Sequence, residues 1–367
     1  MKFICDKYVL MNAINTSIKA VPSKSTISSM EGLLIKADRN VTITGYDLKK
    51  AIYTEVEADV TEAGTAIINA RLLSEMVRRM PEGNITVFCD QDHNTKIKCG
   101  RSEYNFKSLD LNEYPELPKF DGLNNISIPE KLLKNMINKT IFAVAKDEIR
   151  PIYTGTLFEI RGNELTLVSV DGFRLAKKTE IIENSKLEDC SFVVPGFALS
   201  DIEKICEDED GLTEITIGEK HISFKIRNTV VISRRLDGDF LNYRNAIPSS
   251  FKSEIEVEKQ EMISVIDRVS LMLSEKNRNP VKMTFGEGVI SCLCVTPGGK
   301  AEDECICIGN GENLMIGFND RYVADALKAA EGERIKICIN TASSPCVIKP
   351  ADSQADYIYM ILPVRVH

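Results

Sequence analysis

Two closely spaced cysteine pairs are the residues whose types and spacing could most readily bind a metal. Cys292 and Cys294 stand in SCLC, and Cys305 and Cys307 stand in ECIC. Residues two apart in a strand point to one face, so the four thiols could form a tetrahedral zinc site. The usual zinc motif is C-x-x-C, however, and cysteines in strands are commonly core residues. The chain has 11 cysteines, an odd number spread over strand-like segments. We therefore expect reduced, mostly buried thiols and regard a metal site as the less favoured alternative.

Two other segments look like ligand-binding loops but do not meet their requirements. DQDHNT, residues 90–95, begins like a calcium loop, but Thr95 replaces the necessary glycine and Arg101 stands where the bidentate glutamate belongs. PGGK, residues 297–300, ends like a phosphate-binding loop, but Cys294 stands in place of the first glycine and strands surround the segment. Neither segment predicts a bound ion or nucleotide.

The catalytic motifs of common enzymes do not occur in the sequence. The histidines are only His93, His221 and His367, which are too few and too scattered for a His-based mechanism. CEDEDG, residues 206–211, gathers carboxylates just after an expected helix and is better explained as a solvated loop than as a metal site. The sequence predicts a protein that is not an enzyme and needs no cofactor.

Length and composition are those of a soluble globular protein with more than one domain. The chain has 367 residues, 43% hydrophobic and 27% charged, with a net charge of -8. No apolar run approaches the ~18 residues of a membrane helix. The N-terminal segment, residues 1–10, lacks the features of a signal peptide, which predicts a cytoplasmic protein without a membrane partner. A negative chain is no simple nucleic-acid binder, although basic groups could still gather on one inner surface.

The elements that must position these residues recur three times. TITGYDLKKAI, residues 42–52, echoes SVDGFRLAKK, residues 169–178. Gly32 and Gly155 are 123 residues apart, and Leu72 and Leu199 are 127 residues apart. An amphipathic helix, a strand pair, a second helix and further strands follow in the same order each time. The first helices are expected at 6–21, 129–146 and 258–275, and the second helices at 68–80, 194–206 and 317–330.

This repeat predicts an α+β protein made of three tandem domains. We expect the domains to be residues 1–124, 125–250 and 251–367, because polar or proline-containing joins fall near these boundaries. Each domain would consist of two helices packed on antiparallel sheets.

The expected helices have a consistent polarity. In the segment 71–80, an apolar stripe should be buried while the arginines stay outside. The stripe comprises Leu72, Leu73, Met76, Val77 and Met80. A charged helix face usually only keeps a helix solvated, but helices that lean basic in an acidic protein are less easily explained in this way.

Four segments together resemble one known family. They are RPIYTG at 150–155, DGFRLA at 171–176, DGDFLNYRNAIP at 237–248 and YMILPVRV at 359–366. With the three tandem units, they are similar to the β subunit of bacterial DNA polymerase III, the sliding clamp. The resemblance covers essentially the whole chain. It implies a homodimeric, ring-forming, non-catalytic protein that encircles duplex DNA without sequence preference and confers processivity in replication and repair.

The resemblance also implies where partners bind. Polymerase subunits, the clamp loader and repair proteins would insert short apolar peptide motifs into a groove of this chain. The implied lining residues are Tyr153, Val170, Gly172, Phe173, Arg174, Leu175, Leu241, Asn245, Ala246, Met360, Ile361, Leu362, Pro363, Val364 and Arg365. Phe173 stands where many relatives carry His and Leu241 where Pro is common, which bears on partner preference. The implied dimer contacts are Phe106 and Ser108 of one chain with Met272 and Leu273 of the other.

A ring holds DNA by topology, so its inner face needs only weak attraction to phosphates. The DNA-binding candidates are Lys19, Lys24, Arg71, Arg78, Arg79, Lys134, Lys139, Lys146, Arg150 and Arg268. Two alternatives remain at this point. One is a repeat-built peptide-binding scaffold without a DNA role, and the other is a thiolate-zinc enzyme that uses the hairpin at 292–307.

Overall fold

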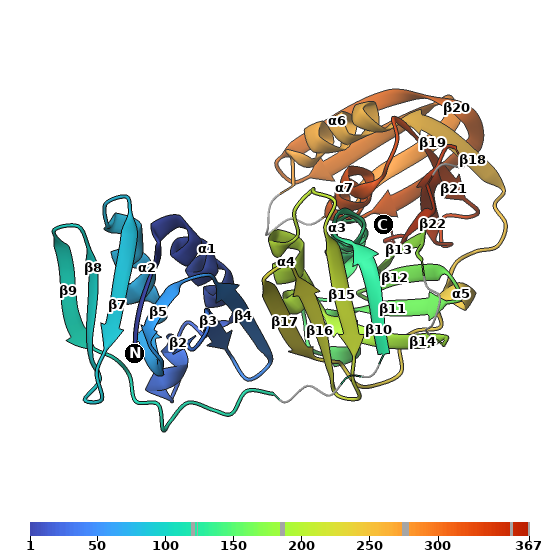
Figure 1. Cartoon of the computed structure of the whole chain (residues 1–367). Coiled ribbons are helices and arrows are strands. Elements are labelled where there is room, and N and C mark those ends of the chain that lie inside the picture. The colour runs from blue at the N-terminus through green and yellow to red at the C-terminus, as the bar shows by residue number, and fades with distance from the viewer. Residues whose placement is uncertain (119–121, 123, 184–187, 274–278, 353–354, 366–367) are drawn as a thin grey trace. The chain divides into compact units, whose positions relative to one another are not determined.

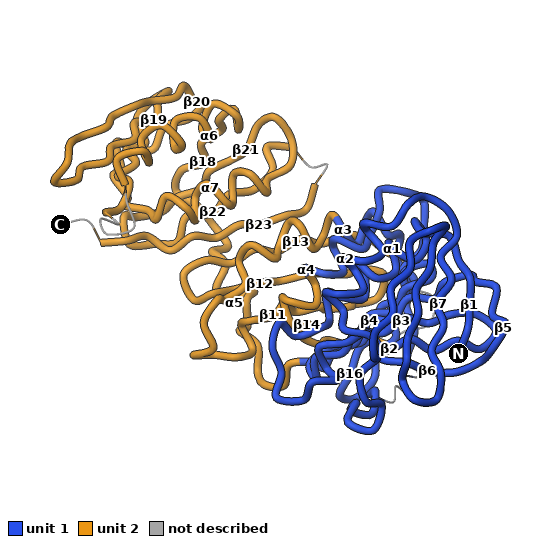
Figure 2. The backbone as a smooth tube through the Cα atoms, turned by 90° about the vertical axis from the view of Figure 1, so that its left-hand side faces the viewer, with its two compact units in different colours: residues 1–134, 200–235 blue, residues 135–199, 236–367 orange. Residues whose placement is uncertain are grey.

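The computed structural model describes residues 1–118, 122, 124–183, 188–273, 279–352 and 355–365. The chain forms two compact units, and the middle third of the sequence contributes to both (Figure 2). Unit 1 contains residues 1–134 and 200–235, and unit 2 contains residues 135–199 and 236–367.

The helices recur in the order that the sequence predicts (Figure 1). The α-helices are α1 (Lys7–Ser17), α2 (Ala70–Arg79), α3 (Glu130–Asn138), α4 (Gly196–Ile205), α5 (Tyr243–Ala246), α6 (Lys259–Ser270) and α7 (Asp320–Ala329). Short 3-10 turns are η1 (Ile18–Ala20), η2 (Ser28–Glu31), η3 (Ile141–Ala143) and η4 (Pro151–Thr154). None of the helices in the described part of the chain is long and apolar enough to cross a membrane.

In unit 1, the described strands form an antiparallel sheet of five and another of eight. The first has the order β5-β1-β7-β8-β9, and the second has the order β10-β15-β16-β17-β4-β3-β2-β6. Their bounds are β1 (Lys2–Asp6), β2 (Gly32–Ala37), β3 (Val41–Tyr46), β4 (Lys50–Val56), β5 (Asp59–Glu62), β6 (Gly64–Asn69), β7 (Asn84–Cys89), β8 (Asn94–Cys99), β9 (Ser102–Lys107), β10 (Asn124–Pro129), β15 (Leu212–Ile217), β16 (His221–Ile226) and β17 (Thr229–Arg234).

In unit 2, the described strands form one sheet of ten, in the order β14-β11-β12-β13-β23-β22-β21-β18-β20-β19. Their bounds are β11 (Gly155–Arg161), β12 (Glu164–Val170), β13 (Arg174–Ile181), β14 (Cys190–Pro195), β18 (Ser253–Glu258), β19 (Val281–Thr296), β20 (Gly299–Phe318), β21 (Arg334–Ile339), β22 (Cys346–Pro350) and β23 (Tyr357–Ile361). Helix α6 packs along the long β19–β20 hairpin (Figure 1).

Side-chain caps explain where several helices begin. Asp6 accepts hydrogen bonds from the backbone N–H groups of Tyr8 and Val9, and Glu258 caps α6 in the same way. The second helices α2 and α7 begin after Asn69 and Asn319, whose side chains accept N–H groups of the first turn. Such caps satisfy amide groups that have no partner inside the helix.

The first helix of each repeat is shorter than the sequence predicts. In the described residues of the expected segments 6–21, 129–146 and 258–275, regular helices extend only over α1, α3 and α6. Residues 274 and 275 of the last segment lie outside the described part of the chain. In the first two repeats the apolar residues continue past the helix into the 3-10 turns η1 and η3, so the helical spacing persists where the α-helix has ended.

The core of unit 1 confirms most of the apolar stripe predicted for α2. Leu73, Met76, Val77 and Met80 are buried in one cluster with residues of the sheets and of α1. Leu72 is 46% exposed, so its assignment to the stripe was wrong. The four buried residues follow the i, i+3, i+4, i+7 spacing of one helix face, and Leu72 lies outside that face.

The repeated sequence at 42–52 and 169–178 corresponds to a repeated turn. Asp47 accepts the N–H groups of Lys49 and Lys50, at 2.9 and 2.8 Å. Asp171 accepts those of Phe173 and Arg174, at 2.9 and 3.0 Å. The second residue of each turn is left-handed, with φ 69° at Leu48 and φ 92° at Gly172.

This comparison predicts that Leu48→Gly stabilises unit 1. A left-handed conformation is unfavourable for a residue with a Cβ atom, and the Leu48 side chain is 57% exposed, so its removal loses little burial. We expect the free energy of unfolding to rise by about 0.5–1 kcal/mol in urea denaturation. Leu212→Gly, at an equally exposed leucine in a strand, should instead lower it, and a decrease for both variants would contradict the explanation.

Candidate functional site

The C-terminal tail runs beside the turn at 171–174. Strand β13 pairs with β23 in the register Arg174–Ile361 and Leu175–Met360. Beyond β23, the Leu362 N–H donates to the Phe173 carbonyl at 2.8 Å, and the Val364 N–H donates to the Gly317 carbonyl at 2.8 Å. These backbone contacts hold the tail on the outer edge of the turn.

An apolar floor lies behind this turn and tail. Tyr153, Val170, Leu175 and Met360 are buried in one cluster, and the Tyr153 ring meets Phe240 edge to face at 5.7 Å between centroids. Ala246 and Leu362 pack against the same cluster and stay partly exposed. Side chains from four separate segments therefore pack in one hydrophobic cluster.

Exposed apolar side chains surround the floor. Phe173 is 61% exposed, Leu241 38% and Val364 41%. Asn245 and Arg365 are exposed, Pro363 is partly exposed, and Gly172 forms the exposed turn. An apolar floor with an exposed apolar rim can accept an apolar peptide side chain. We name this surface, formed by the floor and rim residues, the apolar cleft.

Two of the candidate residues lie on the opposite face of the same strands. Ile361 is buried in the core around α6 and α7. Arg174 is 7% exposed and donates to Asp171 at 2.9 Å and to Asp325 at 2.6 Å. Its guanidinium group lies 4.5 Å from the ring centroid of Tyr322. Arg174 therefore fixes the turn from behind and does not line the apolar cleft.

A neighbouring hollow was not indicated by any motif in the sequence. It has a volume of about 390 Å³ and lies along β12, β13 and β23 beside α5. Thr166, Lys177, Thr179, Tyr243 and Ile358 are among its lining residues, and Lys177 pairs with Asp356 at 3.3 Å. These residues come from separate segments, so only their pairing across strands brings them together.

The basic candidates on α2 are held by a carboxylate of the same helix. Arg78 pairs with Glu75 at 2.6 Å and Arg79 with Glu75 at 3.0 Å. These arginines lower the pKa of Glu75, and their spacing of three and four residues could be read from the sequence. Arg71 donates to the Ser23 carbonyl at 3.3 Å.

Other basic candidates also have acidic partners. Lys134 pairs with Asp208 at 3.1 Å, and Arg268 pairs with Asp303. Lys19 and Lys139 lie just after α1 and α3, and burial lowers the pKa of both amino groups. Lys24, Lys146 and Arg150 are exposed, and Arg150 lies 5.7 Å from the ring centroid of Tyr153.

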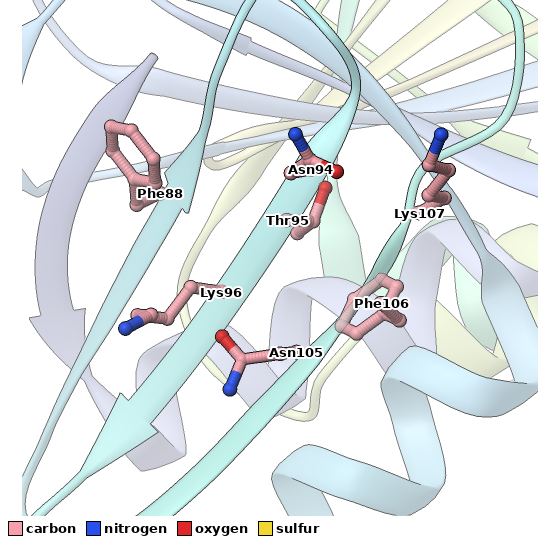
Figure 3. Close-up of a pocket in the computed structure, with 7 residues that line it drawn as sticks. All are labelled: Phe88, Asn94, Thr95, Lys96, Asn105, Phe106 and Lys107. Carbon is pink, nitrogen blue, oxygen red and sulfur yellow. The ribbon is translucent and has the colours of Figure 1, made fainter.

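The candidate dimer residues lie near sheet edges. Strand β9 is an edge of the five-stranded sheet, as described, and Phe106 in β9 lines a hollow of about 350 Å³ with Phe88, Asn94 and Lys96 (Figure 3). Ser108 follows β9, and its hydroxyl donates to the His93 carbonyl at 3.3 Å. Met272 and Leu273 follow α6 and are partly exposed.

The cysteine pairs lie in the core of unit 2. Cys292, Cys294, Cys305 and Cys307 are all buried, and the Cys305 thiol donates to the Met262 sulfur at 3.4 Å. Burial raises the pKa of Cys305 to about 12, which keeps the thiol protonated. Among the described residues, no group of three or more His, Cys, Asp or Glu side chains could hold a metal ion.

The repeated order of helices and strands defines a modular protein built from similar units. Three domain models of the DNA polymerase III beta subunit match it in order: the N-terminal domain at 1–118, the central domain at 127–242 and the C-terminal domain at 244–365. The chain therefore belongs to the DNA polymerase III beta-subunit family. It is a non-catalytic sliding clamp that functions in DNA replication.

Individual relatives are similar over their full length. The beta sliding clamp of Halalkalibacterium halodurans is 33% identical, with all of both chains covered. The crystal structure of the Bacillus subtilis DNA polymerase sliding clamp is 32% identical over 100% of both chains, with a TM-score of 0.95. A DNA polymerase III beta-subunit structure from Eubacterium rectale is 30% identical over 99% of both chains, with a TM-score of 0.95.

Proposed function

We propose that two copies of this chain close head to tail into a cytoplasmic ring that encircles duplex DNA. The ring tethers the replicative polymerase, the clamp loader and repair proteins. Each copy contributes three domains, which we place at residues 1–124, 125–250 and 251–367. DNA passes through without base recognition, so the ring slides while its partners stay attached.

The observation that carries this proposal is a strand pairing that occurs twice in the chain and lacks its third instance. The last strand of the central repeat, β17, pairs with β4 of the first repeat. The last strand of the third repeat, β23, pairs with β13 of the central repeat. Strand β9 is the last strand of the first repeat and forms an edge of its sheet as described. The strand equivalent to β4 and β13 in the third repeat is the first part of β20.

A second copy of the chain supplies the missing pairing. Strand β9 of one chain would join the first part of β20 of the other, and the symmetric contact would close the ring. Phe106 and Ser108 would then approach Met272 and Leu273. A Cβ atom built on Gly299, at the start of β20, would lie 2.8 Å from the Met272 methyl carbon. The segment that carries Met272 therefore lies beside the start of β20 within one copy of the chain. Closure also covers edges that would otherwise promote aggregation.

The test is retention on DNA of two topologies. A loaded ring should stay on a nicked circular plasmid and slide off the same plasmid after linearisation, at equal salt. Sedimentation equilibrium should give the mass of two chains at micromolar concentration. A protein that is monomeric throughout, or that is retained equally on both DNA forms, would rule out the ring.

The basic candidates give a prediction of their own. We expect Arg78→Glu combined with Arg79→Glu to weaken DNA contact and to reduce the slope of log affinity against log salt by about 2. Glu75→Gln should act in the opposite direction, because it releases both arginines from their shared carboxylate. The matched control is Lys36→Glu with Lys225→Glu, at two exposed strand lysines. An unchanged salt slope in the arginine variant would show that these residues do not face DNA.

The apolar cleft is the proposed site for partner peptides. Its exposed Phe173, Leu241 and Val364 offer contacts for apolar side chains, and its floor is already packed, so binding requires little rearrangement. Phe173 supplies an aromatic face to the bound peptide. We expect partner preference to depend on Phe173 and Leu241 more than on the buried floor.

A further inference from the structure

The backbone arrangement that forms the edge of the apolar cleft occurs a second time in unit 1. The turn at 47–50 and strand β4 match the turn at 171–174 and strand β13. The Arg234 N–H donates to the Lys49 carbonyl at 3.2 Å, just as the Leu362 N–H donates to the Phe173 carbonyl.

The ion pairs behind the two turns also correspond. Lys50 pairs with Asp201, and both side chains are largely buried. Arg174 pairs with Asp325 at 2.6 Å. Asp201 and Asp325 are each the sixth residue of their helices, α4 and α7. Each turn is therefore held by the same arrangement: an aspartate that accepts backbone N–H groups and an ion pair to a helix aspartate behind it.

The outward side chains differ in chemical character between the two places. In unit 2, the row across three neighbouring strands is Phe173, Leu362 and Pro345, since Cys346 pairs with Ile361 one step earlier. In unit 1, the corresponding row is Lys49, Arg234 and His221, and His221 is paired directly with Arg234. An apolar row is replaced by a basic row, which comprises Lys49, Arg234 and His221.

The basic row is an unfavourable arrangement for folding alone. Like charges opposite each other on adjacent strands repel. Lys220 lies beside the row, and burial followed by the charges of Arg234 and Lys220 lowers the pKa of His221. Lys49, Lys220 and Arg234 are exposed, and no ion pair joins them to a carboxylate of the described chain. Asp47 accepts backbone N–H groups, and Glu219 is the acid of the adjoining turn.

We propose that the basic row is a docking site for an acidic peptide segment of a partner protein. The occupant is inferred from two features: the positive charge of the row, and a backbone construction whose apolar version is the proposed peptide site. The second argument rests on the proposed function of the apolar cleft. An anionic segment would relieve the repulsion within the row and gain charge-assisted hydrogen bonds from Lys49 and Arg234.

The experiment measures binding of fluorescein-labelled hexaglutamate to the full chain at low salt by fluorescence anisotropy. We expect Lys49→Gln combined with Arg234→Gln to weaken binding about tenfold. The matched control is Lys36→Gln with Lys225→Gln, which removes the same charge from exposed strand positions and should change binding less than about twofold. The thermal transition of the test variant should not fall, because the substitutions remove repulsion.

Three outcomes would overturn the proposal. Equal weakening by test and control variants would indicate attraction without a site. No measurable binding to the unmodified chain would remove the site altogether. Tighter binding of hexathymidylate than of hexaglutamate, lost in the same test variant, would assign the row to nucleic acid.

A parallel titration separates this proposal from the proposed function. An apolar peptide should bind the test variant normally and should lose affinity in Phe173→Ala, which keeps hexaglutamate binding. If only the apolar peptide fails to bind the unmodified chain, the proposed function of the apolar cleft is wrong and the basic row stands on its own charge. If only hexaglutamate fails to bind the unmodified chain, the basic row is not a docking site and the proposed function of the apolar cleft stands.

Discussion

We expect deletion of residues 362–367 to abolish binding of an apolar partner peptide and to leave the proposed dimer intact. The deletion removes the backbone contacts from Leu362 to Phe173 and from Val364 to Gly317, together with one wall of the apolar cleft. Strand β23 ends at Ile361 and stays intact. We expect affinity to fall more than about a hundredfold, about 3 kcal/mol, because residues in the centre of an interface dominate its energy. Isothermal titration calorimetry measures the affinity, and sedimentation equilibrium measures the mass.

A point variant separates the apolar cleft from a general effect of the deletion. Val364→Asp keeps the backbone hydrogen bond to Gly317 but places a charge on the exposed rim of the apolar cleft. It should therefore also lower the affinity for the apolar peptide strongly. Ile181→Asp makes the same change at a side chain of unit 2 that is 69% exposed and lies at the end of β13 far from the turn at 171–174. Equal affinities for the two variants and the unmodified chain would refute the assignment of this site.

Glu331→Ala is expected to cause the largest loss of stability in unit 2. The Lys178 side chain is 2% exposed and pairs with Glu331 at 2.8 Å and with Glu180 at 2.8 Å. Burial by itself lowers the pKa of Lys178, but the hydrogen bonds to both carboxylates outweigh it and raise the pKa. Glu331 also accepts a hydrogen bond from the Asn135 amide at 3.2 Å. Loss of Glu331 should lower the free energy of unfolding by about 3 kcal/mol, since it leaves buried charge poorly compensated.

Urea denaturation followed by circular dichroism measures this change. Lys178→Met combined with Glu331→Gln should lose less than Glu331→Ala alone, because it removes both charges together. Arg334→Ala is the control, since it breaks an exposed pair with Glu256 and should cost less than about 1 kcal/mol. An equal cost for the buried and exposed pairs would show that the Lys178 network contributes no special stability.

Local structure was the part of this fold that could be read from the chain. The turn at 171–174 could be predicted because an aspartate followed by a glycine favours a turn. The turn at 47–50 could be predicted only because its sequence echoes the first, since Leu48 takes a left-handed conformation that its side chain disfavours. The second helices were also close to prediction. The first helices ended earlier than expected because apolar spacing continues into η1 and η3, and spacing alone does not separate an α-helix from a 3-10 turn.

Only part of the candidate site could be predicted from the sequence. The resemblance supplied the residues of the apolar cleft, but their burial divides them. Leu175 and Met360 lie in its floor, whereas Arg174 and Ile361 face the opposite side. Strand alternation predicts that neighbours alternate in direction, yet it does not say which face becomes the surface. The basic row was missed for the same reason, since Lys49 and Arg234 are far apart in sequence and look like ordinary surface charges.

The sequence by itself determined the threefold repeat, the strand and turn pattern within each repeat, and the shortage of groups that could do chemistry. The strand and turn pattern follows from interactions between residues close along the chain, which their spacing encodes. The repeat and the shortage of such groups can be read directly from the order and types of the residues. Only the tertiary structure decided that β17 pairs with β4 and β23 with β13, and that Lys178 meets Glu331. Backbone hydrogen bonds between strands are the same for every residue type, so the choice of partner strand depends on the packing of the whole chain.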